Sequence, residues 1–330
     1  MKEIGGYLQL ERQRGDEYYP SLLRLNLGRT ALLFLMKSLN IKRLWMPHLL
    51  CASVIDTCEK AGYSLSYYSI DENLAPVLNR TLHKDEYLFL VNYYGTLTDD
   101  AIRHYQEVYT HIIVDHTHAF FQAPLPGIPT LYSCRKFFGL PDGAYLYTGR
   151  PESDLWASYS KLEMDISCDR MAHILGRFET DASTYYSQML ATAHSYEDEM
   201  VKQMSPLTRN LLCGIDYPAV QRTREQNYSF LQHHLSASNQ LKFPAPTAPF
   251  VYPYYHRQAP LLRQKLAAAK VYIPVYWKNV IELMPSESIE HTYAQNILPL
   301  PCDQRYTLED MQELLSRLTT ALDELEGKEQ

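Results

Sequence analysis

The sequence predicts an α/β protein in which helices flank a mostly parallel sheet and a smaller α+β domain follows. Three observations support this prediction. The chain has 330 residues, which is too long for a single small hydrophobic core and suggests two domains. Apolar strand-like runs alternate with helical patterns through the first half, as in βαβ units. From about residue 154 the pattern becomes mainly helical, and strand-like runs return only later.

The first half contains most of the expected strands. Its first helix is apolar enough to be buried, and a second helix follows in which Val54, Ile55 and Cys58 recur at helical spacing. Thr98 and Asp99 are capping residues that open a third helix. The expected helices cover 29–39, 50–61 and 98–109, and the expected strands cover 43–46, 64–69, 87–92, 111–115, 130–133 and 144–148.

The second half is expected to complete the large domain and then form the small one. Its last helix is amphipathic, and Thr307 and Asp310 suit a capping box at its start. Helices are predicted within 154–235 and at 307–325, and strands at 249–254 and 271–276.

Composition argues against several classes of protein. A formal net charge of -7 and a pI of about 5.9 argue against nucleic acid or an anionic membrane as the main partner. The N-terminus has no apolar run of signal-peptide length, and no window approaches the ~18 apolar residues of a membrane span. The six cysteines form no CxxC pair, which is typical of reduced thiols. We therefore expect a cytoplasmic protein with no membrane or nucleic-acid partner.

The histidines do not indicate a metal site. His233 and His234 are adjacent and His256 follows several tyrosines, but no Cys/His spacing suits zinc. Solvated or packed side chains are the simpler interpretation, so we expect no metal. The sequence also lacks a Walker loop, GxSxG and HExxH.

Polar side chains close three of the predicted strands. Asn92, Asp115 and Ser133 stand at these ends, and ligands of parallel sheets bind beyond the carboxyl ends of the strands. We therefore expect the three residues to converge on one edge. A buried carboxylate such as Asp115 must be paired or hydrogen-bonded, and taken alone it fits a structural aspartate at least as well as a functional one.

Lys136 lies in a turn between two predicted strands, among aromatic residues. Aromatic burial and the neighbouring Arg135 would lower its pKa and favour the neutral amine that a nucleophile needs. The alternative is a surface lysine, which is the usual place of this residue type.

Gly28, Arg29 and Thr30 open the first long helix. Free backbone amides and the positive end of the helix dipole suit an anion such as a phosphate. Taken alone, this feature is explained more simply as an ordinary helix start.

The order of these features resembles a known family. An anion-binding helix start comes first, then Asp115 with His118 three residues on, then Ser133-x-x-Lys136. In this respect the chain resembles the fold-type-I pyridoxal-phosphate (PLP) enzymes, and more narrowly the DegT/DnrJ/StrS family of sugar aminotransferases. The resemblance runs from about residue 27 to 318, and 297–315 is similar to that family's closing strand and helix.

The resemblance implies a role for each candidate residue. Asp115 would pair with the pyridine nitrogen of pyridoxal 5'-phosphate, and His118 would hydrogen-bond its phenolic oxygen. Lys136 would be the Schiff-base lysine, which also moves a proton once it is displaced. The remaining cofactor-binding residues would be Gly28, Arg29, Thr30 and Ser133 at the phosphate and Asn92 in the pocket wall.

The predicted function is therefore transamination. Glutamate or a similar donor would supply the amino group, and a ketone, with a nucleotide-linked keto sugar as one candidate, would accept it. The family places its active site between two subunits, which implies a homodimer. We place the large cofactor-binding domain at 1–205 and the small C-terminal domain at 206–330.

Two alternatives stay open. Asp115 and Lys136 would serve a PLP-dependent lyase or dehydratase equally well, because fold does not fix function. A non-catalytic binding protein with the same fold is the second alternative. It is motivated by Cys51, which stands where the family carries a stacking aromatic residue, and by the segment ending in Arg170 and Met171, which lacks the family's asparagine.

Overall fold

An eight-stranded sheet forms the centre of the larger part of the chain, and a two-stranded sheet lies in the C-terminal part. The computed structural model describes residues 4–151 and 153–327. The large sheet contains β1 (Leu23–Leu25), β2 (Arg43–Pro47), β3 (Ser64–Ile70), β4 (Pro76–Val77), β5 (Glu86–Val91), β6 (Ile112–Asp115), β7 (Thr130–Ser133) and β8 (Ala144–Tyr147). Its strand order is β1-β8-β7-β6-β5-β2-β3-β4. The small sheet pairs β9 (Tyr252–Tyr255) with β10 (Ile297–Leu300).

Five adjacent strands of the large sheet, β7, β6, β5, β2 and β3, run parallel. The strands β1, β4 and β8 pair in antiparallel fashion. Every residue of β5 and β6 is buried, as expected of a parallel sheet that is covered on both faces. The predicted α/β fold is confirmed, and each strand predicted in the first half is present within one residue of its expected ends.

Helices cover the large sheet and build most of the rest of the chain. None of the helices within 4–151 and 153–327 is long and apolar enough to cross a membrane. The helices are α1 (Gly28–Ser38), α2 (Ala52–Lys60), α3 (Asp99–Tyr109), α4 (Ser153–Tyr159), α5 (Ala172–Glu179), α6 (Tyr186–His194), α7 (Pro206–Leu212), α8 (Tyr217–Leu235), α9 (Ala259–Ala268), α10 (Lys278–Leu283), α11 (Ile289–Asn296) and α12 (Leu308–Glu326).

Two predicted helix starts have the caps that their sequences indicate. The hydroxyl of Thr98 accepts a hydrogen bond from the amide of Ala101, which opens α3. At α12 the Thr307 hydroxyl accepts from the Asp310 amide, and the Asp310 carboxylate accepts in return from the Thr307 amide at 2.8 Å. This reciprocal capping box satisfies two amides that the helix itself leaves unpaired.

The strand predictions for the second half were less accurate. No strand forms at 271–276, because Pro274 interrupts the run and the segment pairs with no neighbour among the described residues. The strand expected at 249–254 forms only as Tyr252–Tyr255. The short strands β1 and β4 were not predicted, since three and two residues carry no readable periodicity.

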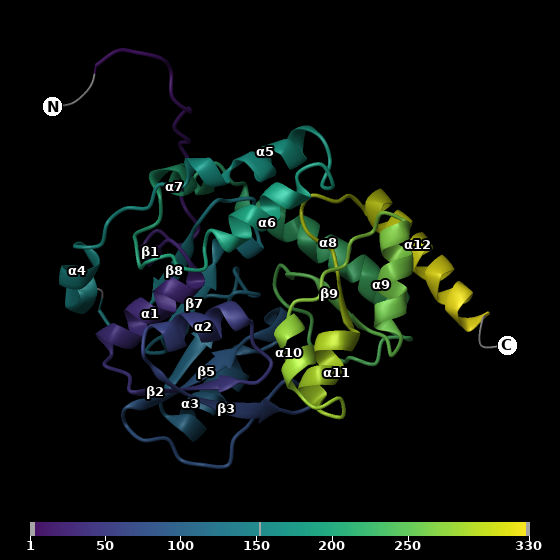
Figure 1. Cartoon of the computed structure of the whole chain (residues 1–330), viewed down its shortest axis with the longest axis horizontal. Helices are drawn as coiled ribbons and strands as arrows, with labels where there is room; N and C mark the ends of the chain where they lie inside the picture. Colours follow the sequence, from purple (N-terminus) through teal and green to yellow (C-terminus); the bar gives the residue numbers. More distant parts are fainter. Residues whose placement is uncertain (1–3, 152, 328–330) are drawn as a thin grey trace.

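A second hydrophobic core lies apart from the core that surrounds the large sheet. It is built by the second half of α8 with β9, α9, β10 and α12, and contains Leu231, Leu262, Leu298 and Leu318. Figure 1 shows α8, α9 and α12 together on the right, beside the large sheet. The first half of α8 instead packs into the main core through Tyr217 and Val220. One helix therefore belongs to both cores.

Arg224 on α8 is buried where the two cores meet, with 1% of its surface exposed. Its guanidinium donates to the carbonyls of Pro249 at 2.8 Å and Phe250 at 3.2 Å. It also donates to the Phe137 carbonyl at 3.2 Å and to Gln304 Oε1 at 2.7 Å. One side chain thus connects α8 to segments from both halves of the chain.

We expect Arg224→Met to lower the free energy of unfolding by about 2–4 kcal/mol, because several buried acceptors lose a charged donor. Urea unfolding measures this value. The exposed Arg222 lies on the same helix, and Arg222→Met should stay within about 0.5 kcal/mol of the wild type. Equal losses in the two variants would contradict the role assigned to Arg224.

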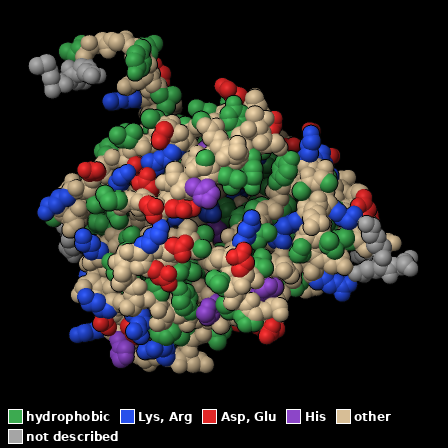
Figure 2. All heavy atoms as spheres, viewed as in Figure 1, with side chains coloured by type: hydrophobic (Ala, Val, Ile, Leu, Met, Phe, Trp, Pro, Cys, Tyr) green, Lys and Arg blue, Asp and Glu red, His purple; other side chains and the backbone are tan. Residues whose placement is uncertain are grey.

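The N-terminal segment leaves the body of the molecule as an extended arm (Figures 1 and 2). Ile4, Tyr7 and Leu8 on this arm are almost fully exposed. Farther along, the amide of Gln13 donates to Asn210 Oδ1 at 2.9 Å. Figure 2 shows basic, acidic and apolar side chains intermixed over the rest of this face, so this face carries no large patch of one charge.

Candidate active site

One cavity of about 220 Å³ collects most of the residues that the sequence singled out. It lies beyond the carboxyl ends of β6 and β7, against the first turn of α1. Six of the eight predicted site residues line it: Gly28, Arg29, Asp115, His118, Ser133 and Lys136. The register of the sheet explains their convergence, because Val91 of β5 pairs with Asp115 and Asp115 pairs with Leu131 of β7.

The other two predicted residues, Asn92 and Thr30, do not line the cavity. The side chain of Asn92 is fully buried; its oxygen accepts from the Leu97 amide at 2.8 Å and its nitrogen donates to Gln122 Oε1 at 2.8 Å. The Thr30 hydroxyl donates to Asn26 Oδ1 at 2.6 Å and accepts from the amide that precedes α1. Both residues hold the backbone that frames the cavity.

Asp115 ends β6 with a buried carboxylate that no described cation contacts directly. Its Oδ1 accepts a hydrogen bond from the amide of Thr117 at 2.8 Å. Burial raises the pKa of Asp115, and the hydrogen bonds from Thr117, followed by the positive charge of Lys136, offset only part of that rise. A positively charged group in the cavity would stabilise the ionised carboxylate.

His118 is held in one neutral form. Its Nδ1 accepts a hydrogen bond from the Tyr94 amide at 3.3 Å, so in the neutral ring Nε2 carries the proton. The ring stacks on Phe250 at 4.3 Å between centroids with 14° between the planes. Burial lowers the pKa of His118 well below its ordinary value. His118 can therefore offer an Nε2–H donor without bringing a charge into the cavity.

Lys136 follows β7 at the end of a short 3-10 turn, Cys134–Lys136. The open cavity makes the side chain accessible, while protein atoms surround it closely. Its Nζ lies 5.5 Å from the ring centre of Tyr276. Burial, followed by the charges of Arg135 and Arg29, lowers the pKa of Lys136, and Cys51 and Asp115 offset part of this effect. A lowered pKa increases the fraction of neutral, nucleophilic amine.

The cavity carries more positive than negative charge. Arg29, Arg135 and Lys136 line it, and Asp115 is the only carboxylate among its lining residues. Within 4–151 and 153–327, none of the three cations makes a side-chain hydrogen bond or an ion pair with the protein. Unpaired cations in a partly desolvated site favour an anionic ligand.

Several lining residues were not predicted as site residues. Arg135 and Thr117 neighbour residues that were, so adjacency was the available signal. Tyr276 and Trp277 also line the cavity, but the sequence placed Tyr276 in a strand that does not form. They approach from the C-terminal half of the chain, and no local pattern indicates so distant a contact.

A buried histidine beneath the site predicts how stability depends on pH. The Nδ1 of His116 lies 3.3 Å from the Asn92 amide nitrogen, and burial lowers the pKa of His116 to about 3. An unfolded histidine titrates near pH 6.5. Between about pH 3 and pH 6.5 the unfolded state therefore binds a proton that the folded state does not. The stability contribution is therefore fully present above about pH 6.5 and is lost progressively as the pH falls toward 3.

We expect His116→Asn to reduce the loss of unfolding free energy between pH 7 and pH 5 by about 2 kcal/mol, which is the linkage of one such proton. Urea unfolding at both pH values measures it. His104→Asn changes an exposed histidine of α3 and should leave the pH dependence as it is in the wild type. An unchanged slope in His116→Asn would contradict the assigned burial effect.

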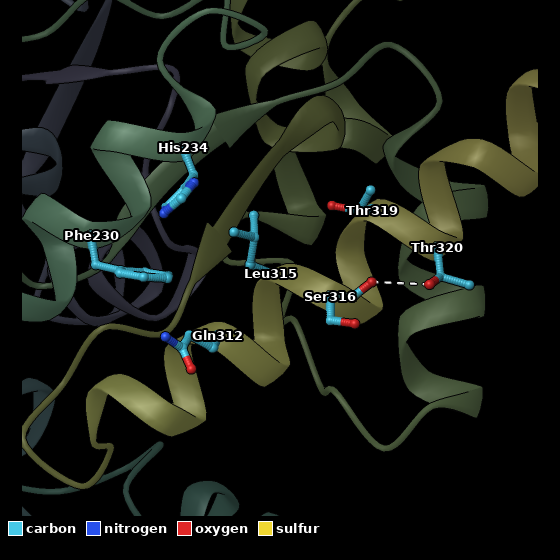
Figure 3. A pocket seen from close by; sticks show the side chains of 7 residues that line it. All are labelled: Phe230, His234, Gln312, Leu315, Ser316, Thr319 and Thr320. Carbon is cyan, nitrogen blue, oxygen red and sulfur yellow. Dashed lines mark hydrogen bonds between the residues drawn. The ribbon is translucent and has the colours of Figure 1, made fainter.

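A second hollow of about 420 Å³ lies between α8 and α12 (Figure 3). Its one titratable lining side chain is His234, whose ring lies 4.6 Å from that of Phe230. Within the described chain, no group of three His, Cys, Asp or Glu residues could hold a metal, here or elsewhere. The lining residues are Phe230, His234, Gln312, Leu315, Ser316, Thr319 and Thr320. We assign no chemistry to this groove.

Solved structures show what this architecture is similar to. A putative sugar aminotransferase from Streptococcus pneumoniae, in its PLP form, superposes with a TM-score of 0.65 at 14% identity, covering 92% of this chain and 88% of that one. A DegT DnrJ EryC1 StrS aminotransferase from Brucella abortus gives 0.60 at 14%, covering 91% and 85%. The sugar aminotransferase CalS13 from Micromonospora echinospora gives 0.64 at 13%, covering 91% and 87%.

No family model matches the sequence, and no curated protein matches it either. At such low identity the structural likeness establishes the fold, which is the fold-type-I architecture that the sequence resemblance implied. The likeness extends over about nine-tenths of the chain.

Proposed function

We propose that this protein is a PLP-dependent aminotransferase of the DegT/DnrJ/StrS family. The observation that carries the proposal is the single cavity that joins a buried carboxylate, a lysine of lowered pKa and unpaired cations. The solved structures with this fold support it, since they include sugar aminotransferases, one of them in a PLP form.

The residues of the cavity fit this cofactor. Pyridoxal 5'-phosphate has a basic ring nitrogen, a phenolic oxygen, an aldehyde and a phosphate. The cavity offers Asp115, His118 Nε2–H and Lys136 for the first three. For the phosphate it offers the first turn of α1, Ser133 and two arginines. Each group of the cofactor thus has a partner of complementary chemistry.

The chemistry follows from what these side chains can hold and move. When bound, the cofactor supplies an electron sink for bonds at the substrate carbon. Asp115 would keep a proton on the ring nitrogen, and His118 would donate to the phenolic oxygen. The Nζ of Lys136 would condense with the aldehyde carbon with loss of water. Once an amino substrate displaces it, this amine would accept the proton of the substrate carbon and deliver it to the former aldehyde carbon.

The finer parts of the proposal concern substrates and assembly. We assign glutamate or a similar amino donor, a keto acceptor with a nucleotide-linked keto sugar as the candidate, a homodimer and a cytoplasmic location. We also assign cofactor binding to 1–205 and the smaller domain to 206–330. The second hydrophobic core, whose residues begin with Tyr228, supports a smaller C-terminal domain, while Tyr217 and Val220 still pack into the main core.

The test is the absorption spectrum of the purified protein with added PLP, before and after glutamate. A band near the visible edge, which glutamate removes as a near-ultraviolet band grows, is the expected result. No band at saturating PLP would favour the non-catalytic binding protein. A band together with release of keto acid and ammonia, in the absence of a second substrate, would favour the lyase.

A further inference from the structure

We propose that the guanidinium groups of Arg29 and Arg135 together bind the phosphate of the cofactor, so that one chain supplies both cations of the phosphate site. The inference rests on the proposed function and assigns side chains to one part of that site. Arg135 was not among the residues that the sequence identified, and Arg29 was expected to contribute only its amide.

The two arginines come from different elements and line the same cavity. Arg29 lies in the first turn of α1, and Arg135 lies in the turn after β7. Both line the cavity beside Gly28 and Ser133. Each lowers the pKa of Lys136, and the charge of Arg29 also lowers the pKa of Arg135. Two cations that line one cavity repel each other, and an anion bound between them would relieve that repulsion.

Arg135 is held in place before any ligand binds. Its guanidinium lies 4.0 Å from the ring centre of Tyr196, an interaction that stabilises a cation on an aromatic face. Tyr196 is almost fully buried, and its hydroxyl donates to the Pro141 carbonyl. A fixed arginine loses little conformational freedom on binding, which favours recognition of a planar or tetrahedral anion.

Arg170 shares the Tyr196 ring with Arg135, and the carboxylates around Arg170 are already engaged. Asp165 accepts hydrogen bonds from Arg170 at 3.0 Å and from Lys202 at 3.4 Å. Glu199 lies 3.1 Å from Lys202 and 3.5 Å from Arg170.

Asp142 is engaged as well. Its carboxylate accepts from the amide and the hydroxyl of Ser205, both at 2.7 Å, and from the hydroxyl of Thr208. Arg135 is therefore left without an anionic partner among the described residues.

Charge balance favours a phosphate monoester as the ligand class. Such a group carries about −1.5 to −2 at neutral pH, which matches the two guanidinium charges. Lys136 and Asp115 are the remaining charged residues of the cavity lining, and they have opposite signs. The free amides of the first turn of α1 add donors for the same anion.

The test compares the dissociation constants of PLP and of pyridoxal, which lacks the phosphate, by absorption and fluorescence titration. Arg29→Gln and Arg135→Gln should each weaken PLP binding by about 10–100-fold, the usual effect of losing one charge-assisted contact. Pyridoxal binding should change by less than about threefold. Inorganic phosphate should compete with PLP in the wild type and no longer compete in the double variant.

Arg103→Gln is the matched control, since Arg103 is exposed on α3 and pairs only with Asp100 among the described residues. It should leave both dissociation constants unchanged. If the arginine variants weaken the binding of PLP and of pyridoxal equally, or weaken neither, the inference is wrong. The proposed function still stands in that case if the normal visible band forms. PLP binding that depends on both arginines but forms no band contradicts the proposed function and supports the phosphate site.

Discussion

Lys136→Ala should lose the covalent attachment of PLP and reduce transamination by about 10³-fold or more. The amine of Lys136 is the only lysine nitrogen that reaches the described cavity, so no other lysine can replace it as a nucleophile. Loss of a positioned proton carrier alone typically costs 10²–10⁴-fold in rate. The phosphate and ring contacts remain, so the variant should still bind PLP without a covalent bond.

Borohydride reduction followed by peptide mass analysis measures the covalent bond directly. The wild type should carry the reduced adduct on Lys136, and Lys136→Ala should carry none. Lys136→Arg restores the positive charge but not the nucleophile, so it separates an electrostatic role from a covalent one. Lys42→Ala, at an exposed position, should behave as the wild type. A borohydride-stable adduct in Lys136→Ala would show that the lysine is wrongly assigned.

The convergence of the predicted residues on one cavity was largely predictable, because two of them stand at strand ends. Hydrophobic runs mark β5, β6 and β7, and parallel pairing brings their carboxyl ends to one edge. Asp115 and Ser133 follow from that rule, and Lys136 ends the short turn that comes directly after β7. Asn92 also follows a strand end, but it lies outside the cavity because its side chain forms hydrogen bonds with the Leu97 amide and the Gln122 side chain instead. The rule predicts where the strand ends lie, and local hydrogen bonds decide in which direction a side chain points.

The part that sequence could not predict depends on contacts between distant segments. Tyr276 and Trp277 reach the cavity from a stretch without regular structure, and Arg135 acquires its orientation from Tyr196, which lies 61 residues later. The partner strands β9 and β10 are also separated by about forty residues of chain. Periodicity reports only neighbours along the sequence, so none of these contacts has a local signature.

Asp115→Asn should leave PLP attached to Lys136 but slow the half-reaction with glutamate by about 10³-fold. The amide has the shape of the carboxylate, and its oxygen can still accept from the Thr117 amide, as Asp115 does at 2.8 Å. It cannot hold a proton on the ring nitrogen, because it carries no charge. The loss should therefore fall on the proton-transfer step, where the negative charge develops, and leave cofactor binding nearly unchanged.

Stopped-flow absorption separates these effects, since it records the visible band and its decay under glutamate independently. Asp115→Glu should restore part of the rate because it restores the charge at a displaced position. Asp100→Asn changes an exposed aspartate of α3 and should have no effect. A decay rate in Asp115→Asn within about threefold of the wild type would mean that the buried carboxylate only caps the Thr117 turn. The structural interpretation of Asp115 would then be the correct one, and the electron sink would need another source of positive charge at the ring nitrogen.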